Sequence, residues 1–178
     1  MNVAIIGPNS EIGRNIKKRL RAEGWGFTAP WDLLIFCRGT MEPIGKFFDT
    51  RASDWEKAIR ANSLNVLMQL RATWRDCAPK AKVVFLGGPN MANPSETYSA
   101  YRCGKSVLEA IVPTLNAEYP DNRFVILHPG VVNTKFHQQT IKAGARAANF
   151  ERVQRIVNGE EKTVTHDEVY EKLKALIA

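Results

Sequence analysis

Two titratable side chains, Tyr101 and Lys105, are four residues apart within residues 95–118, which we expect to form a helix kinked at Pro113. Residues at this spacing share one helix face, so the phenol and the ammonium should be neighbours. A nearby ammonium favours the phenolate and lowers the pKa of a tyrosine from its ordinary value of about 10. Such a pair can give or take a proton near neutral pH. An exposed helix pair without chemistry is the alternative interpretation.

A glycine-containing turn, Gly7 to Gly13, follows the apolar run of residues 2–6. A turn between a buried strand and a helix directs free backbone N–H groups and the positive helix end at an anion. The spacing is neither that of a Walker A loop nor GxGxxG. The turn therefore predicts an anion site, or a glycine turn needed only for packing.

Apolar runs and helical periodicity alternate along the chain. Continuous apolar runs predict buried parallel strands at residues 2–6, 32–37, 82–86 and 123–127, with at most one short strand at 25–30. Helices are expected at about 11–23, 53–76, 95–118 and 165–177. This alternation predicts a single α/β domain over residues 1–178, with about five strands and a helical segment at about 135–178.

The charge is positive, with 25 Lys and Arg against 18 Asp and Glu and a formal net charge of +7. An anionic partner is therefore worth considering. A basic stripe at residues 14–21 fits a solvated helix face, and aromatic residues do not interleave with it as in single-strand binders. We therefore expect no nucleic-acid partner.

Other residue types narrow the class further. Three cysteines without CxxC spacing favour reduced thiols and a cytoplasmic location. No apolar run approaches the ~20 residues of a bilayer span, so no membrane partner is expected. His128, His137 and His166 lack ligand-like spacing, so we expect no metal site.

Five features in order along residues 2 to about 134 resemble the short-chain dehydrogenase/reductase family. They are the glycine turn with Ile12-Gly13, the strand end Phe36-Cys37-Arg38-Gly39, Trp55 seven residues before Asn62, Tyr101-x-x-x-Lys105, and Pro129-Gly130-Val131-Val132-Asn133-Thr134. The resemblance implies a Rossmann-like, doubly wound parallel sheet in shortened form.

The resemblance also implies roles for named residues. Tyr101 would donate a proton to a carbonyl oxygen, Lys105 would bind the nicotinamide ribose and Asn62 would hold a water in a proton relay. Asn62 has an alternative role, in which its amide only satisfies helix carbonyls. The cofactor-binding set carried over from the family is Gly7, Asn9, Ser10, Ile12, Gly13, Arg14, Arg38, Gly39, Asn62, Tyr101, Lys105, Pro129, Gly130, Val132 and Thr134.

The chain departs from the family pattern at two residues. Glu11 replaces the second glycine of the turn, where a carboxylate repels pyrophosphate unless it turns to solvent or pairs with Arg14. Gly88 stands where the family has its catalytic serine, and Ser95, Thr97 or Asn90 are the candidate substitutes.

A third departure is the short connection between the first helix and Asp32, where the family places two strands and a helix. No acidic residue ends the strand expected at 25–30, so the usual partner of the NAD ribose 2′-hydroxyl is missing. Arg14 and Arg38 could instead meet a 2′-phosphate, which favours NADP over NAD.

These observations leave two hypotheses. The first is an NADP-dependent oxidoreductase acting on a small carbonyl or alcohol. The second is a non-catalytic relative that senses a nucleotide or binds a partner protein, because the serine is lost. By resemblance, the helices of Asn62 and Tyr101 would form a homodimer or homotetramer interface through Leu67, Leu70, Val107, Leu108 and Ile111.

Overall fold

A parallel sheet forms the centre of the molecule in the computed structural model, which describes residues 1–88 and 94–178. Its strands are β1 (Val3–Ile6), β2 (Trp31–Phe36), β3 (Cys77–Leu86) and β4 (Arg123–Leu127), in the order β1-β2-β3-β4. All three pairings are parallel, with Val3 opposite Leu33 and Val84 opposite Val125. The predicted parallel α/β sheet is confirmed.

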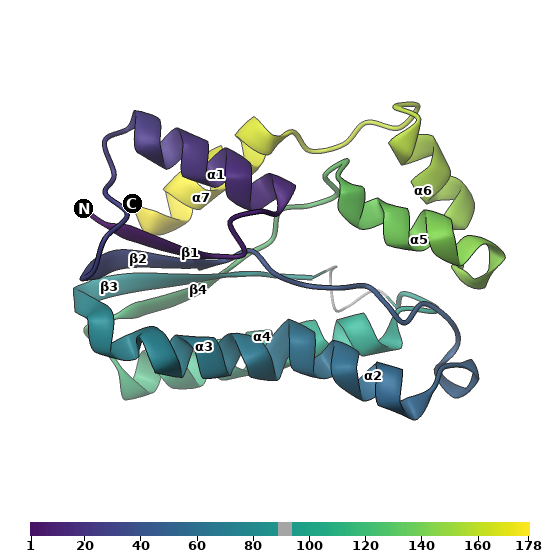
Figure 1. The fold of residues 1–178 in the computed structure, drawn as a ribbon, viewed down its shortest axis with the longest axis horizontal. Helices are drawn as coiled ribbons and strands as arrows, with labels where there is room; N and C mark the ends of the chain where they lie inside the picture. The colour runs from purple at the N-terminus through teal and green to yellow at the C-terminus, as the bar shows by residue number, and fades with distance from the viewer. Residues whose placement is uncertain (89–93) are drawn as a thin grey trace.

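Helices cover both faces of this sheet (Figure 1). Helices α1 (Glu11–Ala22) and α7 (His166–Ile177) lie on one face, and α2 (Ala52–Ile59), α3 (Asn65–Thr73) and α4 (Ser99–Glu118) lie on the other. A π-helical turn, Arg60–Leu64, joins α2 to α3, and short 3₁₀ turns occupy Phe47–Asp49 and Trp74–Asp76. This two-sided covering is the doubly wound arrangement that the resemblance implies.

A small lobe lies beyond the carboxyl ends of the strands (Figure 1). It contains the 3₁₀ turn Lys135–His137, α5 (Gln138–Ala143), the 3₁₀ turn Gly144–Arg146 and α6 (Phe150–Val157). We call residues 135–157 the α5–α6 lobe. Together with α7, it accounts for the helical segment expected at about 135–178.

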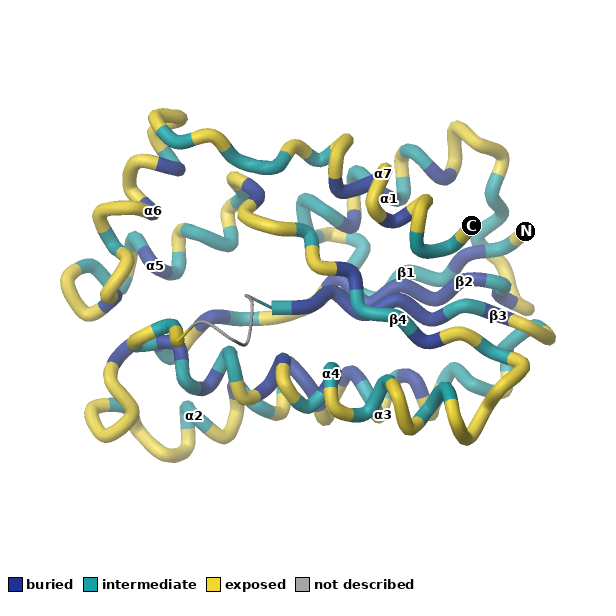
Figure 2. The backbone as a smooth tube through the Cα atoms, turned by 180° about the vertical axis from the view of Figure 1, so that it is seen from behind, coloured by how far each residue is buried: buried dark blue, intermediate teal, exposed yellow. Residues whose placement is uncertain are grey.

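Alternate residues of each strand face opposite layers of the core, because successive side chains of a strand point to opposite faces. Leu33 and Ile35 pack with Ile16 and Leu20 of α1, together with residues of α7. Leu34 of the same strand packs with residues of α3 and α4. The strands are therefore buried on both faces, which explains their continuous apolar runs (Figure 2).

The expectation of about five strands is wrong, because residues 25–30 do not form a strand. Within the described ranges the sheet has four strands, and Gly26 makes only an isolated parallel bridge with Asn2. Val3 N donates to Gly26 O (2.8 Å), whereas Asn2 O accepts from Asp32 N (2.8 Å) on the β2 side. Asn2 O and Val3 N belong to the same peptide group, whose C=O and N–H point to opposite edges of the strand, so Gly26 lies on the outer edge of β1.

The apolar positions proposed for a dimer interface partly serve the core instead. Leu70 and Leu108 are buried against the sheet, and Leu67 packs beside them. The exposed apolar side chains on this surface include Leu64 and Met68. The homodimer or homotetramer stays a prediction. Among the described residues, no helix is long and apolar enough to cross a membrane.

Candidate active site

The glycine turn is packed tightly against the end of β2. Gly7 has a φ of +84°, and a Cβ added to Gly13 would lie 2.6 Å from Gly7 O. Ser10 caps α1, since its Oγ accepts from Gly13 N (3.0 Å) and donates to Gly7 O (3.1 Å). The glycines are thus required for packing, and the anion site stays a prediction.

The structure brings Asn62, Lys105 and Tyr101 together beside Gly39. A Cβ added to Gly39 would lie 2.8 Å from Asn62 Oδ1 and 3.7 Å from Lys105 Nζ. Lys105 Nζ lies 6.0 Å from the centroid of the Tyr101 ring. Gly104, between the two catalytic candidates in sequence, approaches Asn62 so closely that an added Cβ would lie 2.6 Å from Asn62 Cβ. The three residues therefore occupy one site, where α4 crosses the π-helical turn.

Lys105 is a buried cation. Its side chain is 3% exposed, and Nζ donates to Leu86 O (2.7 Å) at the carboxyl end of β3. Burial lowers the pKa of Lys105 from 10.5 to about 8. The neighbouring thiol of Cys37 is buried too, and burial raises its pKa to about 12, so it stays protonated at neutral pH.

Tyr101 differs from the expectation drawn from its spacing to Lys105. Burial raises the pKa of Tyr101 to about 12, the opposite of the predicted direction. The ring packs on Phe136 (centroids 5.9 Å apart) beside an apolar cluster that includes Met41, Ile44 and Tyr98. The α5–α6 lobe thus withdraws the phenol from water, and this burial is what raises the pKa of Tyr101. Tyr101 is a neutral phenol that holds its proton at pH 7.

Asn62 uses its whole side-chain amide inside the protein and is fully buried. Its Oδ1 accepts from Thr40 N (3.0 Å), and its Nδ2 donates to Thr40 O (2.8 Å) and Ala58 O (2.9 Å). The amide therefore fixes the loop after β2 to the helix at its π-helical turn. This is the alternative role considered for Asn62, and the water relay stays a prediction.

Glu11 is partly exposed, and its carboxylate bonds a backbone N–H group rather than Arg14. Its Oε2 accepts a hydrogen bond from the backbone N–H of Lys135 (2.5 Å), across the space between the glycine turn and the loop after β4. Arg14 and Arg38 remain exposed, and the Arg38 stem crosses Gly7, where an added Cβ would lie 2.6 Å from Arg38 Cγ. The two arginines proposed for a 2′-phosphate therefore begin beside the turn, Arg14 directly after Gly13 and Arg38 with its stem at Gly7.

No hydroxyl is available at Gly88, the family's serine position, whose carbonyl lies 3.3 Å from His128 Nδ1. Of the candidate substitutes, Ser95 accepts from Arg102 (3.4 Å). Thr97 Oγ1 donates to Glu96 O (2.6 Å) and accepts from Ala148 N (3.1 Å). Asn90 lies outside the described residues.

The remaining cofactor candidates lie on loops that reach the same edge of the sheet. Ile12 packs against the core, Asn9 is exposed and Val132 is buried. Pro129 O accepts from Lys172 (3.2 Å), Gly130 has a φ of +81°, and Thr134 directly precedes the turn Lys135–His137. Their spatial grouping follows from the parallel strands, whose carboxyl ends share one edge. Their contact with a cofactor stays a prediction.

Contacts made by Gln139 hold the α5–α6 lobe over this edge of the sheet. They were not predicted from the sequence. Gln139 Oε1 accepts from Met41 N (2.7 Å), Thr40 Oγ1 (3.0 Å) and Glu42 N (3.2 Å). Tyr98 Oη hydrogen-bonds Thr140 Oγ1 (2.9 Å) and Asn149. No periodicity or motif marks Gln139, because its partners are almost a hundred residues away in sequence.

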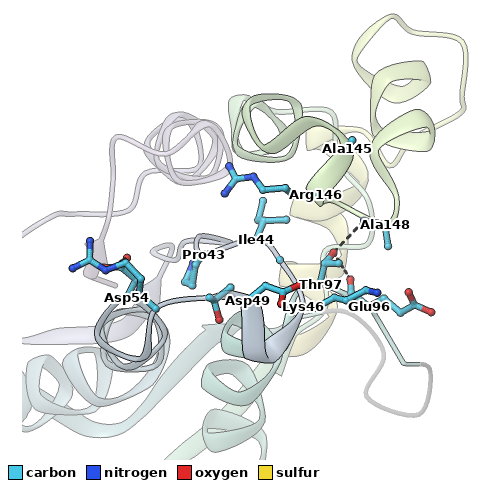
Figure 3. A pocket seen from close by; sticks show the side chains of 13 residues that line it. Pro43, Ile44, Lys46, Asp49, Asp54, Glu96, Thr97, Ala145, Arg146 and Ala148 are labelled. Carbon is cyan, nitrogen blue, oxygen red and sulfur yellow. Dashed lines mark hydrogen bonds and ion pairs between the residues drawn. The ribbon is translucent and has the colours of Figure 1, made fainter.

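A cavity of about 590 Å³ lies beside the lobe, and Figure 3 shows its lining. Side chains of both charges surround it, from the loop before α2 and the first turn of α2, from the segment before α4 and from the lobe. They include Lys46, Asp49, Arg51, Asp54, Glu96 and Arg146. A second cavity of about 530 Å³ shares Ile44 and Arg146 and extends to Thr40 and Gln139. Ile44 also belongs to the apolar cluster against which Tyr101 packs, so it lines both cavities and this cluster.

A doubly wound parallel α/β sheet is the Rossmann-like arrangement, and here a tyrosine, a lysine and an asparagine are grouped at its carboxyl edge. The family model for short chain dehydrogenases matches residues 26–144, and the chain belongs to this family. An oxidoreductase of Schizosaccharomyces pombe described as uncharacterized is 29% identical over 134 residues, or 74% of this chain and 52% of that protein. The chain therefore spans about half the length of this relative.

Solved structures share the fold at low sequence identity. A small-chain dehydrogenase in complex with NADPH has a TM-score of 0.82 at 14% identity, covering 100% of this chain and 91% of that one. The 3-alpha-hydroxysteroid dehydrogenase from Pseudomonas sp. B-0831, complexed with NADH, has a TM-score of 0.75 at 18% identity, covering 100% and 90%. At these identities the similarity concerns the fold alone.

Proposed function

We propose that the protein is an NADP(H)-dependent oxidoreductase that converts a small carbonyl compound and its alcohol into one another, with Tyr101 as the proton donor. The observation that carries this proposal is the grouping of Tyr101, Lys105 and Asn62 around Gly39. The relative from S. pombe is named an oxidoreductase, which supports the same class.

The residues at the nicotinamide side fit a nucleotide cofactor. Lys105 is a buried ammonium whose Nζ donates to the Leu86 carbonyl. Burying a cation costs free energy, so its retention suits a binding role. The glycine turn brings the α1 N-terminus to the same edge, as phosphate binding requires. The cofactor would be held by Lys105 and the turn, and when bound it would supply or accept the hydride.

The residues at the adenosine side fit a dinucleotide cofactor less well. Gly26 makes a single bridge there, and no acidic residue lies at the end of that bridge for a ribose 2′-hydroxyl. Arg14 and Arg38 are exposed near the glycine turn, and their charge suits a 2′-phosphate. We therefore propose NADP rather than NAD, although the two similar structures named above hold NADPH and NADH respectively.

The residues of the chain would act as follows. Tyr101 enters the reaction neutral, because burial raises its pKa to about 12, and it can give its proton to a carbonyl oxygen. Lys105, held by Leu86 O, places positive charge beside the phenol, and this charge stabilises the phenolate that the transfer leaves. Gly88 offers no hydroxyl to the substrate oxygen, and loss of one such donor typically lowers kcat by about 10²–10³. We therefore expect a slow enzyme.

Two observations favour a second candidate, a non-catalytic protein that senses a nucleotide or binds a partner. Glu11 places a carboxylate across the glycine turn, bonded to Lys135 N. Gly88 removes the hydroxyl. Both changes weaken catalysis without disturbing the fold.

The experiment has two stages. NADPH and NADH are first titrated against the intrinsic tryptophan fluorescence of the protein, and we expect saturable binding that favours NADPH. A panel of small aldehydes and ketones is then assayed with the wild type, with Tyr101→Phe, and with Tyr119→Phe, an exposed control tyrosine.

The outcomes separate the candidates. Loss of the proton donor should lower kcat by about 10²–10⁴ in Tyr101→Phe and leave Tyr119→Phe unchanged. Saturable binding without turnover would favour the sensor. Absence of saturable binding of both dinucleotides contradicts the proposed function, and activity that survives in Tyr101→Phe contradicts the role of this residue.

A further inference from the structure

Glu11 and Lys135 are 124 positions apart in sequence and meet across the edge of the sheet where β1 and β4 end. Glu11 is the first residue of α1, and Lys135 begins the 3₁₀ turn Lys135–His137. The first N–H groups of a helical turn have no partner inside that turn. The carboxylate satisfies one of them at Lys135 and lies at the positive end of α1 as well.

The contacts of the neighbouring residues show that the Glu11 carboxylate is the anionic group at the glycine turn. Ser10 Oγ points inward, to Gly7 O and Gly13 N, and the close approach of Gly7 and Gly13 leaves no room for another side chain. Arg14 and Arg38 are both exposed, yet Glu11 bonds the backbone of Lys135. The basic side chains thus remain available to an outside anion, whereas the turn already holds an internal one.

The hydrogen bond between Glu11 and Lys135 is also connected, through the residue after Lys135, to Tyr101, the proposed proton donor. Lys135 is followed by Phe136, whose ring packs on Tyr101 (5.9 Å between centroids). His137 N donates to Thr134 O (3.0 Å), so the turn is a compact unit. A contact that fixes Lys135 therefore also favours the position of Phe136 over the phenol.

We propose that Glu11 is an internal substitute for a ligand phosphate: it closes the glycine turn onto the Lys135–His137 turn, and a phosphate-bearing ligand must displace it. Displacement releases Lys135, loosens Phe136 from Tyr101 and so couples ligand binding to exposure of the phenol. The nature of the ligand, a dinucleotide, rests on the proposed function. The proposal that Glu11 blocks the anion position does not depend on the proposed function.

The test uses the full chain with Glu11→Gly and Glu11→Gln. Glu151→Gly and Glu151→Gln serve as matched controls, because Glu151 is an exposed acid in the first turn of α6 and changes net charge and helix propensity in the same way. Dissociation constants of inorganic pyrophosphate and of NADPH are measured by calorimetry. Amide exchange of residues 134–137 is measured without ligand.

A like charge about 4 Å away weakens the binding of an anion in water by roughly fivefold for each charge of that anion. We therefore expect Glu11→Gly to bind pyrophosphate at least about tenfold more tightly than wild type. Residues 134–137 should also exchange faster in Glu11→Gly, because Lys135 N loses its acceptor. Glu11→Gln can still accept this hydrogen bond, so it should gain pyrophosphate affinity with a smaller change in exchange.

The inference requires both the tighter pyrophosphate binding and the faster exchange, and it is overturned if either change is no larger than in Glu151→Gly. If pyrophosphate binding tightens while NADPH binds to no variant, the inference stands and the proposed function fails. If NADPH binds to the wild type and Glu11→Gly changes neither ligand's dissociation constant, the inference fails and the proposed function stands. If neither ligand binds to any variant, both fail.

Discussion

Replacing Asn62 with alanine should destabilise the protein strongly, because three hydrogen bonds depend on its amide. The change leaves Thr40 N, Thr40 O and Ala58 O without their partner. A buried polar group that loses its partner costs about 1–3 kcal/mol. Thr40 is only partly buried, so water can replace part of that loss. We therefore expect a decrease of about 3 kcal/mol in the free energy of unfolding.

Urea unfolding followed by tryptophan fluorescence measures this decrease, and a thermal scan should show a midpoint lower by about 6–12 °C for a domain of this size. Asn65→Ala is the matched control, since Asn65 is exposed and only three positions along the same bent helix. Its effect should stay within about 0.5 kcal/mol. A loss below about 1 kcal/mol in Asn62→Ala would refute the assignment of these hydrogen bonds as the main role of the residue.

Two further predictions concern the lysine and the lobe. The folded pKa of Lys105, about 8, lies below its unfolded value of 10.5, so the unfolded chain binds more protons between these values and the wild type gains stability as pH rises through them. Urea titrations at several pH values should show a gain of about 3 kcal/mol for wild type relative to Lys105→Met across this window, and parallel curves would contradict it. Gln139→Ala removes the acceptor of Met41 N and should speed proteolysis within residues 135–157, whereas Gln139→Glu keeps an acceptor and should cleave like wild type. Equal cleavage of all three proteins would show that this contact does not hold the lobe.

Strands were the most predictable part of the fold, because a parallel strand buried on both faces carries apolar side chains without interruption. Leu33, Leu34 and Ile35 are each at most 1% exposed and form such a run. The start of β3 was less predictable: the strand begins at Cys77, five residues before the predicted start. Cys77 pairs with Trp31 ahead of a register shift, and Lys80 in this stretch has a φ of +61°. Such irregular pairing leaves no period in the sequence.

The site was predictable where it depends on local spacing and unpredictable where it depends on tertiary burial. Helical geometry placed Tyr101 and Lys105 on one face, and the structure brings both to the same site. The direction of the tyrosine pKa shift could not be read from this spacing, because Phe136 and the lobe that bury the ring are more than thirty residues away. The Glu11–Lys135 contact is equally non-local.

Gly26 also explains how a shortened chain keeps the handedness of its fold. Helix α1 and helix α3 lie on opposite faces of the sheet, while the strand order advances from β1 to β2 to β3 in one direction. Two crossovers in one direction over opposite faces have opposite hands, and about 98% of parallel crossovers are right-handed. A direct β1–α1–β2 connection would therefore break this rule.

The chain avoids that conflict because the segment after α1 first reaches the outer edge of β1. There Gly26 bridges Asn2, and residues 27–30 then pass the amino end of β1 to reach β2. The connection from β1 through α1 to Gly26 therefore moves away from β2 and crosses one face of the sheet. The connection from β2 through α3 to β3 moves in the other direction and crosses the other face. Because both direction and face are reversed, the two crossovers have the same hand. A Cβ at Gly26 would overlap the side-chain amide of Asn2, which would have to turn away to admit it. One bridge thus stands where the family pattern has two strands, so the chain is short on the side where the proposed cofactor would place its adenosine.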